Sequence, residues 1–186
     1  MRRIELDAGF FAGAVSVEAG AGWLKPWRLP WEQRQLFLSP GDGWLARAAC
    51  TSGVRLRFAT AASQVRLSFE PLPAVPAVCL RETFVLDATV DGEIVASARV
   101  PPGGDEALFS GLPAGDKVVE LWLPPEVPIA IRALEVEEDG DCRPASDPRP
   151  AWVTYGSSLT HCVRAHGSAR IWPATVARRR GLNLTA

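Results

Sequence analysis

The segment FVLDATVDGEIVASARV, residues 84–100, constrains the fold of this chain more than any other part of the sequence. Apolar and polar residues alternate on both sides of a central Asp-Gly pair, and such a pair readily adopts the two positive φ angles of a tight hairpin turn. Because the side chains of a strand alternate between its two faces, Phe84, Leu86, Ala88 and Val90 share one face. The segment therefore predicts an antiparallel hairpin with one buried face.

Short alternating segments fill most of the chain up to about Val136. VRLRFAT (54–60) and QVRLSF (64–69) are separated only by AAS, and this spacing predicts a second hairpin. Further strands are expected at residues 14–18, 35–38, 117–123 and 129–137. Repeated short strands without a convincing helical period indicate a mainly β fold, and specifically an antiparallel β-sandwich of the jelly-roll type.

The pattern changes after an acidic, proline-containing segment that ends at Pro150. AWVTY then predicts a short strand, and WPATVARRRGL predicts a helix with Pro173 in its first turn and Gly181 just beyond its end. LNLTA at the end of the chain predicts another strand. A strand, a loop, a helix and a strand in this order are typical of the start of an α/β domain with a parallel sheet.

We therefore expect three parts: a β-sandwich domain at 1–140, a linker at 141–150 and the incomplete start of an α/β domain at 151–186. The first strand of a parallel sheet without its partners leaves unpaired edges and an uncovered apolar face. We accordingly expect the last part to be weakly ordered, with rapid amide exchange.

Charge and composition exclude several classes of protein. The chain has 20 basic and 21 acidic residues, and this balance gives no electrostatic basis for binding nucleic acid or an anionic membrane. Arg178, Arg179 and Arg180 occupy the last turn of the predicted helix, where cations favour the helix dipole. No apolar run approaches the ~20 residues of a membrane span, and Glu5 and Asp7 interrupt any signal peptide, so we expect a cytoplasmic protein.

A serine pair follows the predicted strand in WVTYGSSLT, residues 152–160. A hydroxyl at the carboxyl end of such a strand points into the crevice where open α/β sheets bind ligands. The nucleophile motif G-x-S-x-G would align with Gly156 and Ser158, but it requires glycine where this chain has Thr160. Ser157 and Ser158 could also act only as helix caps.

The residues YGSSLTHC, followed by WPATVARRRGLNL, resemble the first conserved block of the SGNH/GDSL hydrolases in its G-S-S-[IL]-T-H variant. The resemblance implies that Ser158 is the nucleophile and that its backbone N–H contributes to the oxyanion hole, while Ser157 replaces the aspartate of the block. It also implies a flavodoxin-like α/β domain behind an N-terminal jelly-roll similar to carbohydrate-binding modules. The implied activity is that of a serine esterase or acyltransferase acting on a small-molecule ester, for example an acylated carbohydrate, without a metal or organic cofactor.

The remaining conserved blocks of that family supply a glycine, an asparagine and the Asp-x-x-His base, and none of them is found here. No acidic residue follows Ser158. We therefore expect an N-terminal fragment that is inactive by itself. A dyad of Ser158 with the nearby His161 or His166 would lack an orienting acid, and a metal site of these histidines with Cys162 would lack a fourth ligand.

Seven tryptophans are present, and Trp23, Trp27 and Trp31 are close together in GWLKPWRLPWE, which we interpret as a loop. Exposed aromatic rings can stack on sugars, but we favour a packing role that docks the sandwich on the catalytic part, with Arg28 stacked among the rings. The alternative function is a non-catalytic carbohydrate- or protein-binding module.

Overall fold

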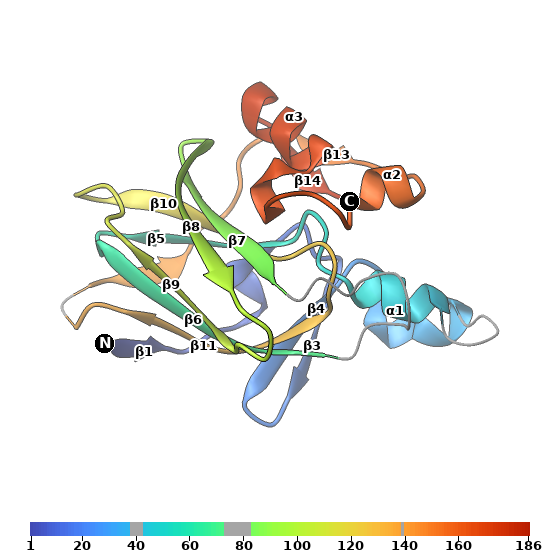
Figure 1. The fold of residues 1–186 in the computed structure, drawn as a ribbon, viewed down its shortest axis with the longest axis horizontal. Coiled ribbons are helices and arrows are strands. Elements are labelled where there is room, and N and C mark those ends of the chain that lie inside the picture. Colours follow the sequence, from blue (N-terminus) through green and yellow to red (C-terminus); the bar gives the residue numbers. More distant parts are fainter. Residues whose placement is uncertain (38–42, 73–82, 139) are drawn as a thin grey trace.

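The computed structural model describes residues 1–37, 43–72, 83–138 and 140–186. Within these ranges two antiparallel six-stranded sheets pack face to face (Figure 1). The first sheet contains β1 (Arg2–Ile4), β3 (Ser16–Gly20), β4 (Trp23–Trp27), β6 (Gln64–Pro71), β9 (Glu106–Ser110) and β11 (Ile129–Val136). The second contains β2 (Phe11–Ala12), β5 (Arg55–Thr60), β7 (Phe84–Val90), β8 (Glu93–Val100), β10 (Lys117–Trp122) and β12 (Cys142–Pro144). The predicted mainly β class and antiparallel sandwich are confirmed.

The predicted β7–β8 hairpin is present. Asp91 and Gly92 form its turn with φ angles of 51° and 80°, and β7 pairs with β8 from Phe84↔Val100 to Val90↔Glu93. The alternate apolar residues of β7 all lie in the main core between the two sheets. Local alternation and turn chemistry were therefore sufficient to predict this element.

The predicted hairpin of residues 54–69 is wrong, although both of its strands exist. β5 pairs with β10, β12 and β2 in the second sheet, whereas β6 pairs with β11 and β9 in the first. Both strands direct apolar residues into the same core from opposite sides, among them Phe58 and Leu67. An alternating pattern indicates which face is buried but does not specify the pairing partner.

Two further expectations near the N-terminus are corrected. The strand expected at 35–38 is part of the 3-10 segment η2 (Trp31–Phe37), and residue 38 lies outside the described ranges. The tryptophan-rich segment is a loop only in part, because it contains β4. Pro26 lies opposite Val17 in the β3–β4 pair, beyond the single position Leu24↔Ile131 at which β4 pairs with β11. The helix α1 (Gly43–Ala49) and the 3-10 turn η1 (Ala8–Phe10) were not predicted.

The C-terminal unit has the expected order: β13 (Ala151–Val153), α2 (Ser158–His161), η4 (Ser168–Arg170), α3 (Trp172–Arg180) and β14 (Asn183–Thr185). β13 and β14 pair in parallel, with Trp152 opposite Leu184. Pro173 lies in the first turn of α3, and Gly181 ends the helix in the left-handed conformation at φ 61° and ψ 46°. This part of the structure confirms the predicted beginning of an α/β fold.

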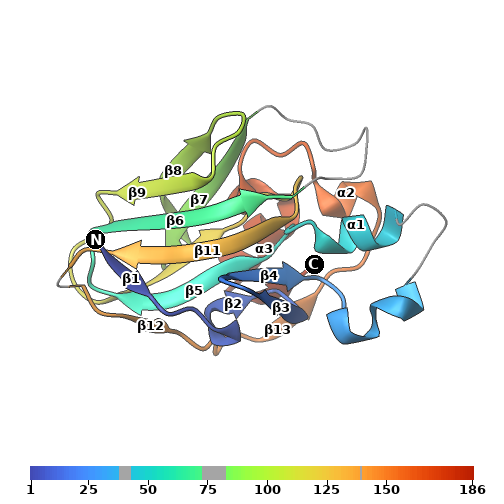
Figure 2. The same cartoon turned by 90° about the horizontal axis from the view of Figure 1, so that it is seen from below.

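The C-terminal unit packs on the sandwich, so apolar residues that were expected to be uncovered are buried there, while the expected rapid amide exchange stays a prediction. It covers the outer face of the second sheet, so that in Figure 2 it lies behind the first sheet. A separate apolar cluster joins Trp122 of β10 to Ile171, Ala174 and Leu184, all at most 1% exposed. Burial of this cluster against the sandwich stabilises the unit that contains the β13–β14 pair.

The segment expected as a linker also participates in the fold. Residues 142–144 form β12 against β5, and Asp147 and Arg149 contribute to a buried ion network described below. The domain limits 1–140, 141–150 and 151–186 stay a prediction.

Candidate site around Ser158

Ser158 is the first residue of α2, directly after the turn that follows β13. Ser157 precedes it in an extended conformation, and its side chain makes no capping hydrogen bond. The side chain of Ser158 is exposed, and no residue in the described ranges forms a hydrogen bond with its Oγ. The hydroxyl is therefore open to a ligand.

Gly156 makes this tight turn sterically feasible. A Cβ atom at Gly156 would overlap the side-chain oxygen of Thr160 and would lie 2.9 Å from its Cβ. Thr160 folds back over the turn because α2 starts immediately after it, with Thr160 N and His161 N both donating to Ser157 O. The glycine and threonine of the G-S-S-L-T block thus pack against each other.

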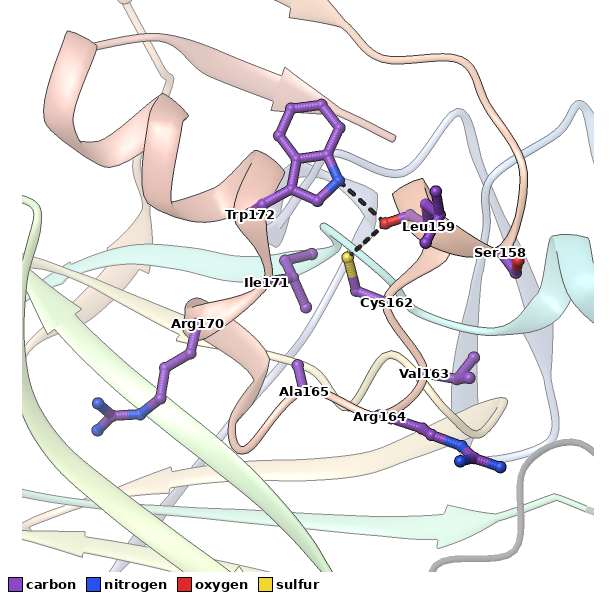
Figure 3. A pocket seen from close by; sticks show the side chains of 9 residues that line it. All are labelled: Ser158, Leu159, Cys162, Val163, Arg164, Ala165, Arg170, Ile171 and Trp172. Atoms are coloured by element: carbon purple, nitrogen blue, oxygen red, sulfur yellow. Dashed lines mark hydrogen bonds between the residues drawn. The ribbon is translucent and has the colours of Figure 1, made fainter.

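A pocket of about 670 Å³ opens beside α2 (Figure 3). Its wall is mostly apolar and includes Leu159, Ile171 and Trp172, with Ser158 at one side. Arg164 and Arg170 are the charged residues among those that line it. The volume is in the range of small-molecule sites.

The carbonyl oxygen of Leu159 fixes α2 to the rest of the C-terminal unit. Trp172 Nε1 donates to it at 3.0 Å and Cys162 Sγ at 2.9 Å, as the dashed lines in Figure 3 show. The Trp172 ring also meets Trp152 edge to face, with centroids 6.2 Å apart. These contacts link α2 to the start of α3 and to β13, while Leu159 and Trp172 stay 81% and 46% exposed.

His161 points towards the sandwich. Its Nε2 lies 2.8 Å from the carbonyl oxygen of Pro125, which requires Nε2 to carry the donated proton, and its own carbonyl accepts from Ser52 Oγ at 2.9 Å. Burial lowers the pKa of His161 to about 4, assisted by the positive charge of Arg28, while the bond to Pro125 opposes the change. His166 is exposed. No hydrogen bond between either histidine and Ser158 is present, so the structure does not bring together a dyad.

The C-terminal unit is held by a buried ion network centred on Arg55, which is 0% exposed. Arg55 Nε donates to Glu120 at 2.9 Å, Nη2 to Asp147 at 3.0 Å and to Asn183 Oδ1 at 2.7 Å, and Nη1 to the carbonyl of Leu184 at 3.0 Å. Arg149 bonds to the same two carboxylates. Burial alone would raise the pKa of Asp147, but hydrogen bonds and the charge of Arg149 outweigh it and lower that pKa to about 2.

A second buried carboxylate anchors the loop before α3. Asp87 Oδ2 accepts from Ala169 N at 3.0 Å, and Ser168 Oγ accepts from Asp87 N at 2.9 Å while donating to Trp122 O at 2.7 Å. Gly167 lies so close to Asp87 that a Cβ there would clash. Sequence reasoning missed these anchors. The available signal was that Asp87 and Glu120 interrupt otherwise apolar strands.

The tryptophan cluster of Trp23, Trp27 and Trp31 does not line the pocket beside Ser158. Trp27 is 4% exposed, stacks on Trp31 with centroids 4.6 Å apart, and packs against α1. Arg28 is not stacked on the rings as predicted, because Lys25 and Arg34 occupy those positions. Instead Arg28 Nε donates to Cys50 O at 2.7 Å, and its Nη1 reaches Ala186 O at 3.4 Å.

In the described part of the chain, no group of three His, Cys, Asp or Glu residues could hold a metal ion. Cys142 and Cys162 are free thiols, Cys50 Sγ donates to the carbonyl oxygen of Ala46 at 3.4 Å, and Cys79 lies outside the described residues. None of the described helices has the length and apolar character needed to cross a bilayer.

Comparison with known proteins agrees with this architecture. The family described as "SsfX3, N-terminal domain" matches residues 10–130. The salicylyl-acyltransferase SsfX3 from a tetracycline biosynthetic pathway is 34% identical with a TM-score of 0.86, over 100% of this chain and 54% of that chain. A putative GDSL-like lipase from Bacteroides ovatus is 19% identical with a TM-score of 0.70, over 94% of this chain and 52% of that one. No curated protein matches the sequence.

A family two carbohydrate esterase from Clostridium thermocellum, solved with cellohexaose, shares the fold at 16% identity, with a TM-score of 0.53 over 73% of this chain and 45% of that chain. The fold is thus that of SGNH/GDSL hydrolases that carry an N-terminal β domain. The chain belongs to the family of the SsfX3 N-terminal domain and spans about half the length of these solved relatives.

Proposed function

We propose that this chain carries the nucleophile of a serine esterase or acyltransferase that acts on ester bonds, and that Ser158 is that nucleophile. The observation that carries the proposal is the position of Ser158. It lies exposed at the start of α2, at the end of a parallel strand and beside a mainly apolar pocket of about 670 Å³. The sequence around it is the G-S-S-L-T-H block, and all of this chain aligns at 34% identity with about half of an acyltransferase.

In the proposed reaction, Ser158 Oγ attacks the ester carbonyl carbon while a general base accepts the hydroxyl proton. The alcohol leaves with a proton, and an acyl-enzyme forms on Ser158. Water or an acceptor alcohol then attacks the acyl carbon and regenerates the serine. The backbone N–H of Ser158 stabilises the negative charge that develops on the carbonyl oxygen.

The base is proposed to come from an Asp-x-x-His block of the kind that the SGNH/GDSL family has, which is not among these 186 residues. His161 is unsuited to this role because its Nε2–H is engaged by the carbonyl of Pro125. The substrate is proposed to be a small-molecule ester, with an acylated carbohydrate as one candidate. The predicted inactivity of these residues by themselves follows from the same requirement for a base.

The alternative proposal, a non-catalytic binding module, is less well supported. Within the tryptophan cluster, Trp27 is buried against α1 and stacked on Trp31, so its ring is not available to stack on a sugar. The sandwich face formed by β5, β7 and β10 is occupied by the C-terminal unit. This supports a sandwich that serves as a platform for the catalytic part.

The experiment joins this chain to the part of the 34% identical acyltransferase that it does not cover, and follows hydrolysis of an activated ester. We expect Ser158→Ala to lower the rate at least ~10³-fold, as removal of a nucleophile does in other serine hydrolases. Ser157→Ala is the matched control, because its side chain is adjacent and makes no capping bond. Labelling by a fluorophosphonate, located by mass spectrometry, should occur on Ser158. The assignment would be refuted if the label were found on Ser157 and if Ser157→Ala, rather than Ser158→Ala, caused the loss of rate.

A further inference from the structure

The helix that bears Ser158 is too short to define its own orientation. α2 spans four residues, Ser158–His161, and its internal bonds are those from Thr160 N, His161 N and Cys162 N. A single helical turn is marginal in water because nucleation costs more than one turn of hydrogen bonds recovers. The direction of the Ser158 side chain therefore depends on what holds α2 from outside.

His161 makes two hydrogen bonds of opposite sense with the sandwich. Its side chain donates to the carbonyl of Pro125 at 2.8 Å, and its main-chain carbonyl accepts from Ser52 Oγ at 2.9 Å. Ser52 is 0% exposed, so this hydroxyl has little freedom to turn away. Both the side chain and the backbone at the end of α2 are thus fixed.

The receiving surface is itself cross-linked. Ser52 lies in the turn before β5, and Pro125 lies in the connection from β10 to β11. Thr51 Oγ1 donates to Pro124 O at 2.6 Å, and Leu123 N donates to Val54 O at 3.0 Å. Because each bond joins the two loops, they act as one rigid support for His161.

We propose that His161 is a positioning residue which fixes the Ser158 turn to the β-sandwich, so that the sandwich sets the direction of the nucleophile. The clamp on Leu159 from Trp172 and Cys162 fixes the same turn to the C-terminal unit only. His161 is the member of the G-S-S-L-T-H block that connects the turn to the other domain. Its function as a positioning residue rests on the proposed role of Ser158, but its anchoring contacts do not.

The test uses this 186-residue chain, labelled with ¹⁵N and ¹³C. The imidazole ¹⁵N shifts of His161 should report the Nε2–H tautomer at neutral pH. Ser52→Ala and His161→Leu should each increase amide exchange at Thr160, His161 and Cys162 at least ~10-fold, because one turn without anchors is marginal. His161→Gln, which retains a donor at similar reach, should restore slow exchange relative to His161→Leu.

Ser168→Ala is the matched control. Ser168 Oγ is also buried and also joins the two parts, but through Trp122 and Asp87 rather than α2. It should leave exchange within α2 unchanged. The proposal would be overturned if His161 were the Nδ1–H tautomer. It would also be overturned if neither Ser52→Ala nor His161→Leu increased amide exchange in α2. Fluorophosphonate labelling of Ser158 reports on the nucleophile separately, so failure of one proposal can be distinguished from failure of the other.

Discussion

Arg55 Nη2, completely buried between the second sheet and the C-terminal unit, donates a hydrogen bond to Oδ1 of Asn183, 2.7 Å away at the first residue of β14. The same guanidinium reaches the carbonyl of Leu184 and the carboxylates of Glu120 and Asp147. One side chain of the sandwich therefore positions the parallel strand pair that leads to Ser158. The stability of the two parts should be coupled through it.

Replacement of Arg55 by alanine is expected to lower the free energy of unfolding by about 3–5 kcal/mol, because Glu120 and Asp147 lose one of their buried partners. Urea unfolding of the chain measures this. Arg132→Ala is the control, since the Arg132–Glu70 pair is about half exposed on both sides and should contribute less than about 1 kcal/mol. Equal losses in the two variants would contradict the role of the buried network.

Acid should weaken the same network through Asp147. Its pKa in the folded chain is lowered to about 2 from an ordinary 3.8. The ionised carboxylate therefore stabilises the fold fully at any pH above the pKa that Asp147 has in the unfolded chain. This contribution is lost as pH falls from about 4 towards about 2. In unfolding experiments across that window, Asp147→Asn should be less stable at neutral pH but should show a shallower pH dependence. A parallel dependence in both proteins would exclude this role of Asp147.

His161 should affect stability in a different pH window. Its pKa is lowered to about 4 from 6.5, because burial and the positive charges of Arg28 and Arg47 disfavour the protonated ring. The hydrogen bond to Pro125 favours the protonated ring but is the weaker effect. The unfolded chain takes up the proton first, so stability that is fully present above about 6.5 declines as pH falls towards 4. His161→Gln should remove that part of the slope. Only two histidines are present, so NMR titration of the variant also identifies the His161 signal.

Gly156→Ala should disturb the Ser158 turn. The added methyl would overlap the side chain of Thr160, and overpacking of this kind costs about 1–3 kcal/mol. Thr160→Ala should recover part of the loss, which a double-mutant cycle of thermal unfolding would measure. Gly43→Ala is the control: the added methyl would meet only Nη1 at the end of the long Arg47 side chain, at 3.3 Å, so little change is expected there. Additive effects of the Gly156 and Thr160 substitutions would argue against the contact.

Sequence patterns predicted the elements whose determinants are local. The β7–β8 hairpin follows from Asp91 and Gly92, and α3 from Pro173 and Gly181, because these residues fix backbone angles without help from distant parts. The strand pairing of residues 54–69 could not be obtained in this way. Phe58 and Leu67 satisfy the same alternation whether their strands pair or face each other across a core.

The features of the site also separate into those that depend on local sequence and those that depend on distant contacts. The sequence by itself determined the Ser158 turn, through a glycine, two serines and a threonine that lie within one short block, and its strand-to-helix context. Only the tertiary structure decided that Asp87, Glu120 and Arg55 are buried rather than solvated, because the unit that covers them lies far away in the sequence. It likewise decided that His161 donates to Pro125, since a hydrogen bond between residues 36 positions apart depends on how two loops meet in space.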